Sequence, residues 1–138
     1  MRIVVDTNVL LSALRSAHGA SFVLLQLLGR DLFSVHVSVP LVLEYEAVVK
    51  RHLSDLPVNA DDVEDVLDFF CSVAELHAIF YGWRPQLRDP DDDMVLEVAV
   101  AASADIVTFN KRDFVGCEQF GVRLWTPAEF LRKIGVLQ

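Results

Sequence analysis

Short segments rich in β-branched apolar residues alternate along this chain with segments of helical periodicity, and this alternation limits the folds it can adopt. The strand-like segments are residues 3–5, 33–39, 75–81, 105–109 and 122–126, and the helix-like segments are residues 9–14, 19–30, 40–52, 60–73, 91–104 and 127–135. Strands that alternate with helices form a parallel sheet covered on both faces. We therefore predict the α/β class, with a three-layer α/β/α sandwich around a central parallel sheet of about four to five strands.

The length of 138 residues, without repeats, linkers or low-complexity stretches, predicts a single domain over residues 1–138. Hydrophobic residues make up 53% and charged residues 23%, which favours a globular protein. No apolar run reaches the ~18 residues of a membrane helix, and Asp6 interrupts the stretch where a signal peptide would lie. We expect a cytoplasmic protein without membrane contact. Cys71 and Cys117 form no CxxC pair and are predicted to be reduced, buried thiols.

The net charge of −8 is concentrated in one part of the chain. Residues 55–93 hold eleven of the twenty acidic residues and only two basic ones, so the remainder carries a net charge of +1. Within residues 60–73 the apolar spacing leaves the acidic residues mostly on one solvated face. A docking surface for a basic partner is the alternative interpretation of that face. The acidic balance therefore does not exclude a nucleic-acid substrate.

Asp6 stands at the junction between the first strand-like segment and the first helix-like segment. Aspartate at such a junction is a common helix cap, typically worth ~1 kcal/mol. The same position lies beyond the carboxyl end of a strand, where open α/β sheets bind ligands. The residue by itself leaves both interpretations open.

Glu44 lies in the second turn of the helix that follows the second strand-like segment, and its helical neighbours Leu41, Ala47 and Val48 are apolar. A buried carboxylate is costly unless it is paired or binds a metal. A salt bridge to Arg51 and simple exposure to solvent are the structural alternatives.

More acidic residues flank the later elements. Asp89 and Asp92 precede the long apolar helix, whereas Asn110 and Asp113 follow the fourth strand-like segment. Capping and turn formation explain each position separately. Parallel strands, however, would bring all of these groups to one edge of the sheet.

Carboxylates gathered at one edge repel each other unless one is protonated or a cation lies between them. Oxygen ligands without Cys or His suit Mg²⁺ or Mn²⁺, which activate water during phosphodiester hydrolysis. The sequence has no glycine-rich phosphate loop, GxSxG elbow or HExxH spacing. Four histidines are interpreted as ordinary surface or core residues: His18, His36, His52 and His77. The pattern indicates a metal-dependent nuclease or phosphatase.

Three blocks, VVDTNVLLSAL, VPLVLEYEAVV and DPDDDMVLEVAVAASADIVTFNKRDF, resemble the PIN (PilT N-terminus) domain in the same order. They are similar in particular to the VapC-like toxin ribonucleases of bacterial type II toxin–antitoxin systems, and the resemblance covers essentially the whole chain. It implies a PIN fold and an endoribonuclease that cleaves single-stranded RNA with one or two Mg²⁺ or Mn²⁺ ions. It also implies a homodimer and an antitoxin protein as partner.

The resemblance gives metal-binding and catalytic roles to four acids: Asp6, Glu44, Asp92 and Asp113. It gives supporting polar roles to Asn8, Asp89, Thr108 and Asn110. Many family members have aspartate where this chain has Asn110, which implies a weaker fourth ligand or one that acts through water. Asp91 and Asp93 are expected to be solvated.

Lys111 and Arg112, beside the predicted site, and Arg15, at the end of the first helix, are the candidate phosphate-binding cations. Lys50 and Arg51 are weaker candidates. The segment FYGWRPQLR mixes aromatic and basic residues that either stack an unpaired base or pack beneath a loop.

Two other functions remain open from the sequence. One is a non-catalytic PIN module that binds RNA or a protein partner, with the acids serving as caps and surface charge. The other is a metal-dependent phosphatase for small substrates. Metal binding distinguishes the nuclease from the first, and internal cleavage of a long RNA distinguishes it from the second.

Overall fold

The structure is a computed structural model that describes the backbone of residues 1–79 and 90–138. Its centre is a sheet of five parallel strands in the order β3-β2-β1-β4-β5. The strands are β1 (Arg2–Val5), β2 (Ser34–Val37), β3 (Glu75–Leu76), β4 (Asp105–Val107) and β5 (Leu124–Trp125). The predicted α/β class and parallel sheet are confirmed. The third strand, predicted over residues 75–81, pairs only over Glu75–Leu76, and residues 80 and 81 lie outside the described part of the chain.

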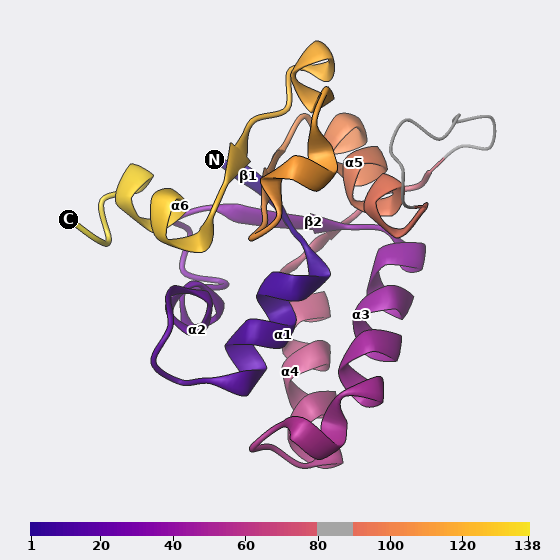
Figure 1. Ribbon diagram of the computed structural model, residues 1–138, viewed down its shortest axis with the longest axis vertical. Helices are drawn as coiled ribbons and strands as arrows, with labels where there is room; N and C mark the ends of the chain where they lie inside the picture. Colours follow the sequence, from indigo (N-terminus) through magenta and orange to yellow (C-terminus); the bar gives the residue numbers. More distant parts are fainter. Residues whose placement is uncertain (80–89) are drawn as a thin grey trace.

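Helices cover both faces of this sheet (Figure 1). They are α1 (Thr7–Arg15), α2 (Ala20–Gln26), α3 (Val39–Arg51), α4 (Ala60–Val73), α5 (Pro90–Ala102) and α6 (Pro127–Lys133). Three short 3-10 turns are η1 (Leu53–Asp55), η2 (Lys111–Phe114) and η3 (Cys117–Phe120). In Figure 1, α1 to α4 lie below β2 and α5 lies above it, in contact with β1, β2 and β4.

Local chemistry sets where the helices begin and end. The Ser38 hydroxyl accepts the amide of Leu41 at the start of α3, and Asn59 forms a capping box with Asp62 at the start of α4. The helix predicted over residues 19–30 ends earlier, at Gln26, and the turn after it closes at Gly29 with φ +78°. A Cβ at Gly29 would also lie 3.1 Å from Cγ1 of Val73, so both the backbone and the space favour glycine.

The core fills the space between the sheet and the helices. Its largest fully buried side chains include Tyr45, Phe70, Phe114 and Phe130. The ring of Phe70 meets that of Tyr45 edge-on, with 5.4 Å between their centroids.

The prediction that both cysteines are buried is wrong for one of them. Both are free thiols, but Cys117 is buried whereas Cys71 is exposed. The inward stripe of α4 is formed by Val63, Leu67 and Phe70. Cys71 is the next residue after Phe70, so its side chain points about 100° around the helix from Phe70 and faces solvent.

Among the described residues, no single helix has both the length and the apolar composition of a membrane span. Helices α1 and α2 meet these criteria only when taken together, and they are bent by 97° relative to each other.

Candidate active site

Asp6 is both a helix cap and a buried carboxylate at the carboxyl end of β1. One of its oxygens, Oδ1, accepts a hydrogen bond of 2.8 Å from the backbone amide of Thr7, where α1 begins. The other, Oδ2, accepts the hydroxyl of Thr108 at 2.7 Å. The side chain is only 7% exposed. The two interpretations of Asp6 left open by the sequence are therefore compatible, because each carboxylate oxygen keeps a further lone pair for another ligand.

The charge of Asp113 acts on the carboxyl group of Asp6. Burial raises the pKa of Asp6, whereas the hydrogen bonds from Thr108 and Thr7 lower it and the charge of Asp113 raises it further. Asp113 lies exposed on η2, which packs against α5. A divalent cation between these carboxylates would offset both the repulsion and the loss of solvation. The donor set therefore fits Mg²⁺ or Mn²⁺.

The shifted pKa of Asp6 predicts how its replacement changes stability. At a pH well below 3.8, the pKa of an ordinary aspartate, Asp6 is protonated in both the folded and the unfolded chain, so its burial does not reduce stability. As the pH rises through the higher folded pKa, the folded chain loses stability because its carboxylate ionises in a buried place. Asp6→Asn should therefore raise the free energy of unfolding of the metal-free chain more at about pH 7 than at about pH 2.5. Urea unfolding at both pH values measures this, and an equal effect at the two would contradict the burial penalty.

Thr108, at the end of β4, connects the strand ends to the start of α1. Its side chain is completely buried. Its hydroxyl donates a hydrogen bond to Asp6 and accepts one of 3.0 Å from the backbone amide of Asn110. Nearby, the amide of Phe109 donates to Oδ1 of Asn8 at 3.5 Å. Three of the predicted supporting residues thus lie around Asp6, although Asn110 takes part through its backbone. Their functional roles stay predictions.

Thr108→Val removes this hydroxyl with little change in shape. Asp6 then loses a donor and the Asn110 amide loses an acceptor, so we expect a loss of about 1–3 kcal/mol in the free energy of unfolding. Thr108→Ser, which keeps the hydroxyl, is the matched variant. Urea unfolding at neutral pH compares the two, and equal stability would show that the hydrogen bonds contribute little.

The remaining predicted acids come from neighbouring helices. Glu44 is half-buried on α3, and Asp92 is half-buried in the first turn of α5. These two helices pack against each other, and α5 also contacts β1 and η2. Helix α5 thus contacts α3, β1 and η2, the elements that carry or directly precede the other three predicted acids. Asp89 and the segment FYGWRPQLR (residues 80–88) lie outside the described part of the chain.

No three of the four predicted acids, all of which are described, have ligand atoms within 4.8 Å of one another. Among the side chains that the structure describes, the group of three or more candidate metal ligands with atoms within 4.8 Å of one another consists of His36, Glu75 and His77. None of these residues belongs to the predicted site. The prediction that the four histidines are ordinary residues missed this cluster.

Asp93 is buried, at 4% exposure, although it was predicted to be solvated. It shares the buried face of α5 with the fully buried Leu96, three residues later. Burial, and then the charge of Asp93, raise the pKa of Glu97 one turn further on. Helical spacing from Leu96 is the signal that would have found Asp93. The side chain of Asp91 lies outside the described part of the chain.

The candidate cations differ in their surroundings. Lys111 forms an ion pair with Glu129. The hydrogen bond that Lys111 donates in this pair is the main reason why the pKa of Glu129 is lowered. Arg112 is exposed on η2. Arg15 lies at the far end of α1, about 12 Å along the helix from its first residue, so it is not brought to Asp6. Lys50 pairs with Glu46 and with Glu64 of α4.

The parallel sheet and the acidic residues beyond its carboxyl edge define an α/β protein with a candidate metal-binding edge. The chain belongs to the PIN-domain family, because the family model described as PIN domain matches residues 2–112. The family predicted from the three sequence blocks is confirmed.

The fold is also similar to a chain in the crystal structure of VapBC2 from Rickettsia felis bound to a DNA fragment from its promoter. The TM-score is 0.58 at 19% sequence identity, and the match covers 91% of this chain and 98% of that chain. A comparison with curated proteins gave no match.

Proposed function

We propose that this chain is a metal-dependent endoribonuclease that hydrolyses single-stranded RNA, and that it is the toxin of a toxin–antitoxin pair. The observation that carries the proposal is the buried carboxylate of Asp6, which is held by Thr108 and raised in pKa by burial and by Asp113. A fold keeps such an unfavourable charge where a cation compensates for it. Membership of the PIN-domain family supports the same conclusion.

In this proposal Asp6, Glu44, Asp92 and Asp113 hold one or two Mg²⁺ or Mn²⁺ ions. A bound ion of this kind supplies Lewis acidity to a phosphate oxygen and lowers the pKa of water. Thr108 fixes the orientation of Asp6 through its hydrogen bond. Hydrolysis would form a bond between phosphorus and the oxygen of water and break one phosphorus–oxygen bond of the RNA backbone, and a proton of the water would pass to the departing ribose oxygen.

The RNA backbone needs positive charge beside this acidic edge. Arg112 is the strongest candidate, because it is exposed on η2 next to Asp113. Lys111 would have to share its charge with Glu129. Arg15 becomes a weaker candidate because of its distance from Asp6. None of these residues provides sequence-specific readout of bases.

The toxin assignment extends to partners. The similar structure is that of a VapBC2 complex on promoter DNA, which supports an antitoxin protein as the partner of this chain. We further propose that residues 1–138 form one PIN domain, that the chain forms a homodimer and that it acts in the cytoplasm.

The test is incubation of the purified chain with a long labelled single-stranded RNA in Mg²⁺, in Mn²⁺ and in EDTA. The proposal predicts internal cuts that depend on the metal. Phosphate release from small esters without internal cuts would instead identify a phosphatase. RNA binding without any cleavage would identify a non-catalytic module, for which the capping bond of Asp6 to Thr7 already provides a structural role.

A further inference from the structure

Four polar side chains lie on one face at the β2–β3 edge of the sheet. Ser34 and His36 are two residues apart on β2, and Glu75 and His77 are two residues apart at β3. Side chains two residues apart in a strand share a face. His36 and Glu75 are direct partners in the parallel register, and the amide of His77 donates to the carbonyl of Val37 at 2.8 Å. The backbone pairing therefore fixes the arrangement.

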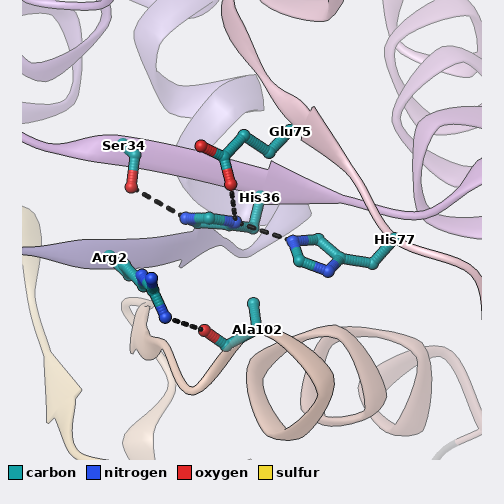
Figure 2. A network of polar contacts seen from close by, with 6 residues as sticks. All are labelled: Arg2, Ser34, His36, Glu75, His77 and Ala102. Atoms are coloured by element: carbon teal, nitrogen blue, oxygen red, sulfur yellow. Dashed lines mark hydrogen bonds and ion pairs between the residues drawn. The ribbon is translucent and has the colours of Figure 1, made fainter.

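The side chains of Glu75 and His77 both approach the same nitrogen of His36 (Figure 2). Its Nδ1 lies 2.8 Å from Nε2 of His77 and 3.4 Å from Oε2 of Glu75. The three ligand atoms all lie within 4.8 Å of one another. A hydrogen bond between the two imidazoles explains the first distance but not the approach of the carboxylate to the same nitrogen, because that atom has one proton or one lone pair in the ring plane.

The separations are close to those of a tetrahedral zinc centre. Zinc–nitrogen bonds of about 2.0–2.1 Å place neighbouring ligand atoms about 3.3–3.4 Å apart. Glu75 and His36 already match this separation, and the two imidazoles need to part by only about half an ångström. Glu75 is 65% exposed and His77 is half-buried, so the side chains are accessible and free to make this adjustment.

The surroundings of His36 resemble those of a metal ligand. Its second nitrogen, Nε2, lies 2.8 Å from the hydroxyl of Ser34. If Nε2–H donates to that oxygen, Nδ1 carries the lone pair that a metal requires. The nearby guanidinium of Arg2 donates to the carbonyl of Ala102 at the end of α5 (Figure 2). That hydrogen bond places the positive charge of Arg2 at the carboxyl end of α5, where the helix dipole favours it.

We propose that His36, Glu75 and His77 bind one divalent transition-metal ion of the zinc class, with Ser34 as a positioning residue and a fourth position open to water. Two imidazoles and one carboxylate are a ligand set that zinc uses. Because β3 pairs over only two residues, the ion would fasten this edge strand to β2. The inference is independent of the proposed function, since it uses none of the four predicted acids.

The experiment is calorimetric titration of the metal-free chain with Zn²⁺, repeated with Co²⁺, whose visible absorption reports four-coordinate binding. We expect one equivalent that depends on this cluster, with its affinity reduced at least about 100-fold in His77→Gln, because replacing even a residue that only supports a ligand costs 10–100-fold. Any zinc bound at the acidic edge persists in His77→Gln and is counted separately. Glu75→Gln, at an exposed position, should also weaken binding without affecting folding.

Two controls locate the ion. His18→Ala, an exposed histidine elsewhere, should leave the affinity unchanged. Asp6→Asn, which alters the predicted acidic edge, should also retain the zinc equivalent. Zinc should raise the melting temperature of the Asp6→Asn protein, but not that of the Asp6→Asn protein that also carries His77→Gln. The proposal is overturned if the wild type binds no zinc at micromolar concentrations, or if His77→Gln and Glu75→Gln bind it as tightly as the wild type.

Discussion

Asp6→Asn should reduce metal-dependent RNA cleavage by at least about 100-fold, because metal stabilisation of the transition state contributes several kcal/mol and each 1.36 kcal/mol is a factor of ten in rate. Asparagine keeps the size of the side chain and one oxygen, which can still accept the amide of Thr7. It removes the negative charge that would hold the ion. The loss should therefore appear in the rate while the fold is retained.

The measurement is the initial rate of cleavage of a labelled single-stranded RNA at saturating Mn²⁺. Asp65→Asn is the matched control, because it removes the same charge from an exposed position of α4 and should leave the rate unchanged. Circular dichroism of both variants verifies folding. A folded Asp6→Asn protein that cleaves at the wild-type rate would remove Asp6 from the mechanism.

Tyr45→Ala should cost about 3–5 kcal/mol in the free energy of unfolding, as is usual when a large aromatic side chain is removed from a core. Tyr45 is fully buried on α3, packs edge-on against Phe70, and donates its hydroxyl to the carbonyl of Val5. Val5 directly precedes Asp6. Tyr45 thus attaches the helix that carries Glu44 to the strand end that carries Asp6.

Tyr45→Phe separates packing from hydrogen bonding. It retains the ring and removes only the donor to Val5, so we expect a smaller loss of about 1–3 kcal/mol. Urea unfolding of both variants measures these values, with Leu43→Ala as the control on the exposed face of the same helix, expected within about 0.5 kcal/mol of wild type. If Tyr45→Phe were as stable as the wild type, the bond to Val5 would contribute nothing to holding the two elements together.

The layers of the fold could be predicted because the sequence alternates two hydrophobic periods. Buried parallel strands are continuously apolar, as in residues 3–5, and the helices show stripes such as Val63, Leu67 and Phe70. Family membership could also be predicted, since the three sequence blocks occur in the order found in the family. Strand length at the sheet edge could not, because pairing of β3 depends on the register with β2 rather than on local composition.

The site was predicted less completely than the fold. The position of Asp6 at a strand end was visible, but its bond to Thr108 joins residues 102 positions apart. Asp93 was misplaced because a run of aspartates hides which member continues the apolar face of α5. The His36–Glu75–His77 cluster was missed because its ligands come from two strands 39 to 41 positions apart, and the register that aligns them follows only from the folded sheet.

The central claim is that the acidic edge holds the catalytic ion, and manganese binding tests it most directly. Calorimetric titration would compare the metal-free chain with Asp6→Asn, both carrying His77→Gln so that the histidine cluster makes no contribution. We predict one or two bound ions in the protein with Asp6, and at least about tenfold weaker binding in Asp6→Asn, because a buried carboxylate ligand is lost. Equal affinities in the two proteins, or no manganese binding in either, would contradict the claim.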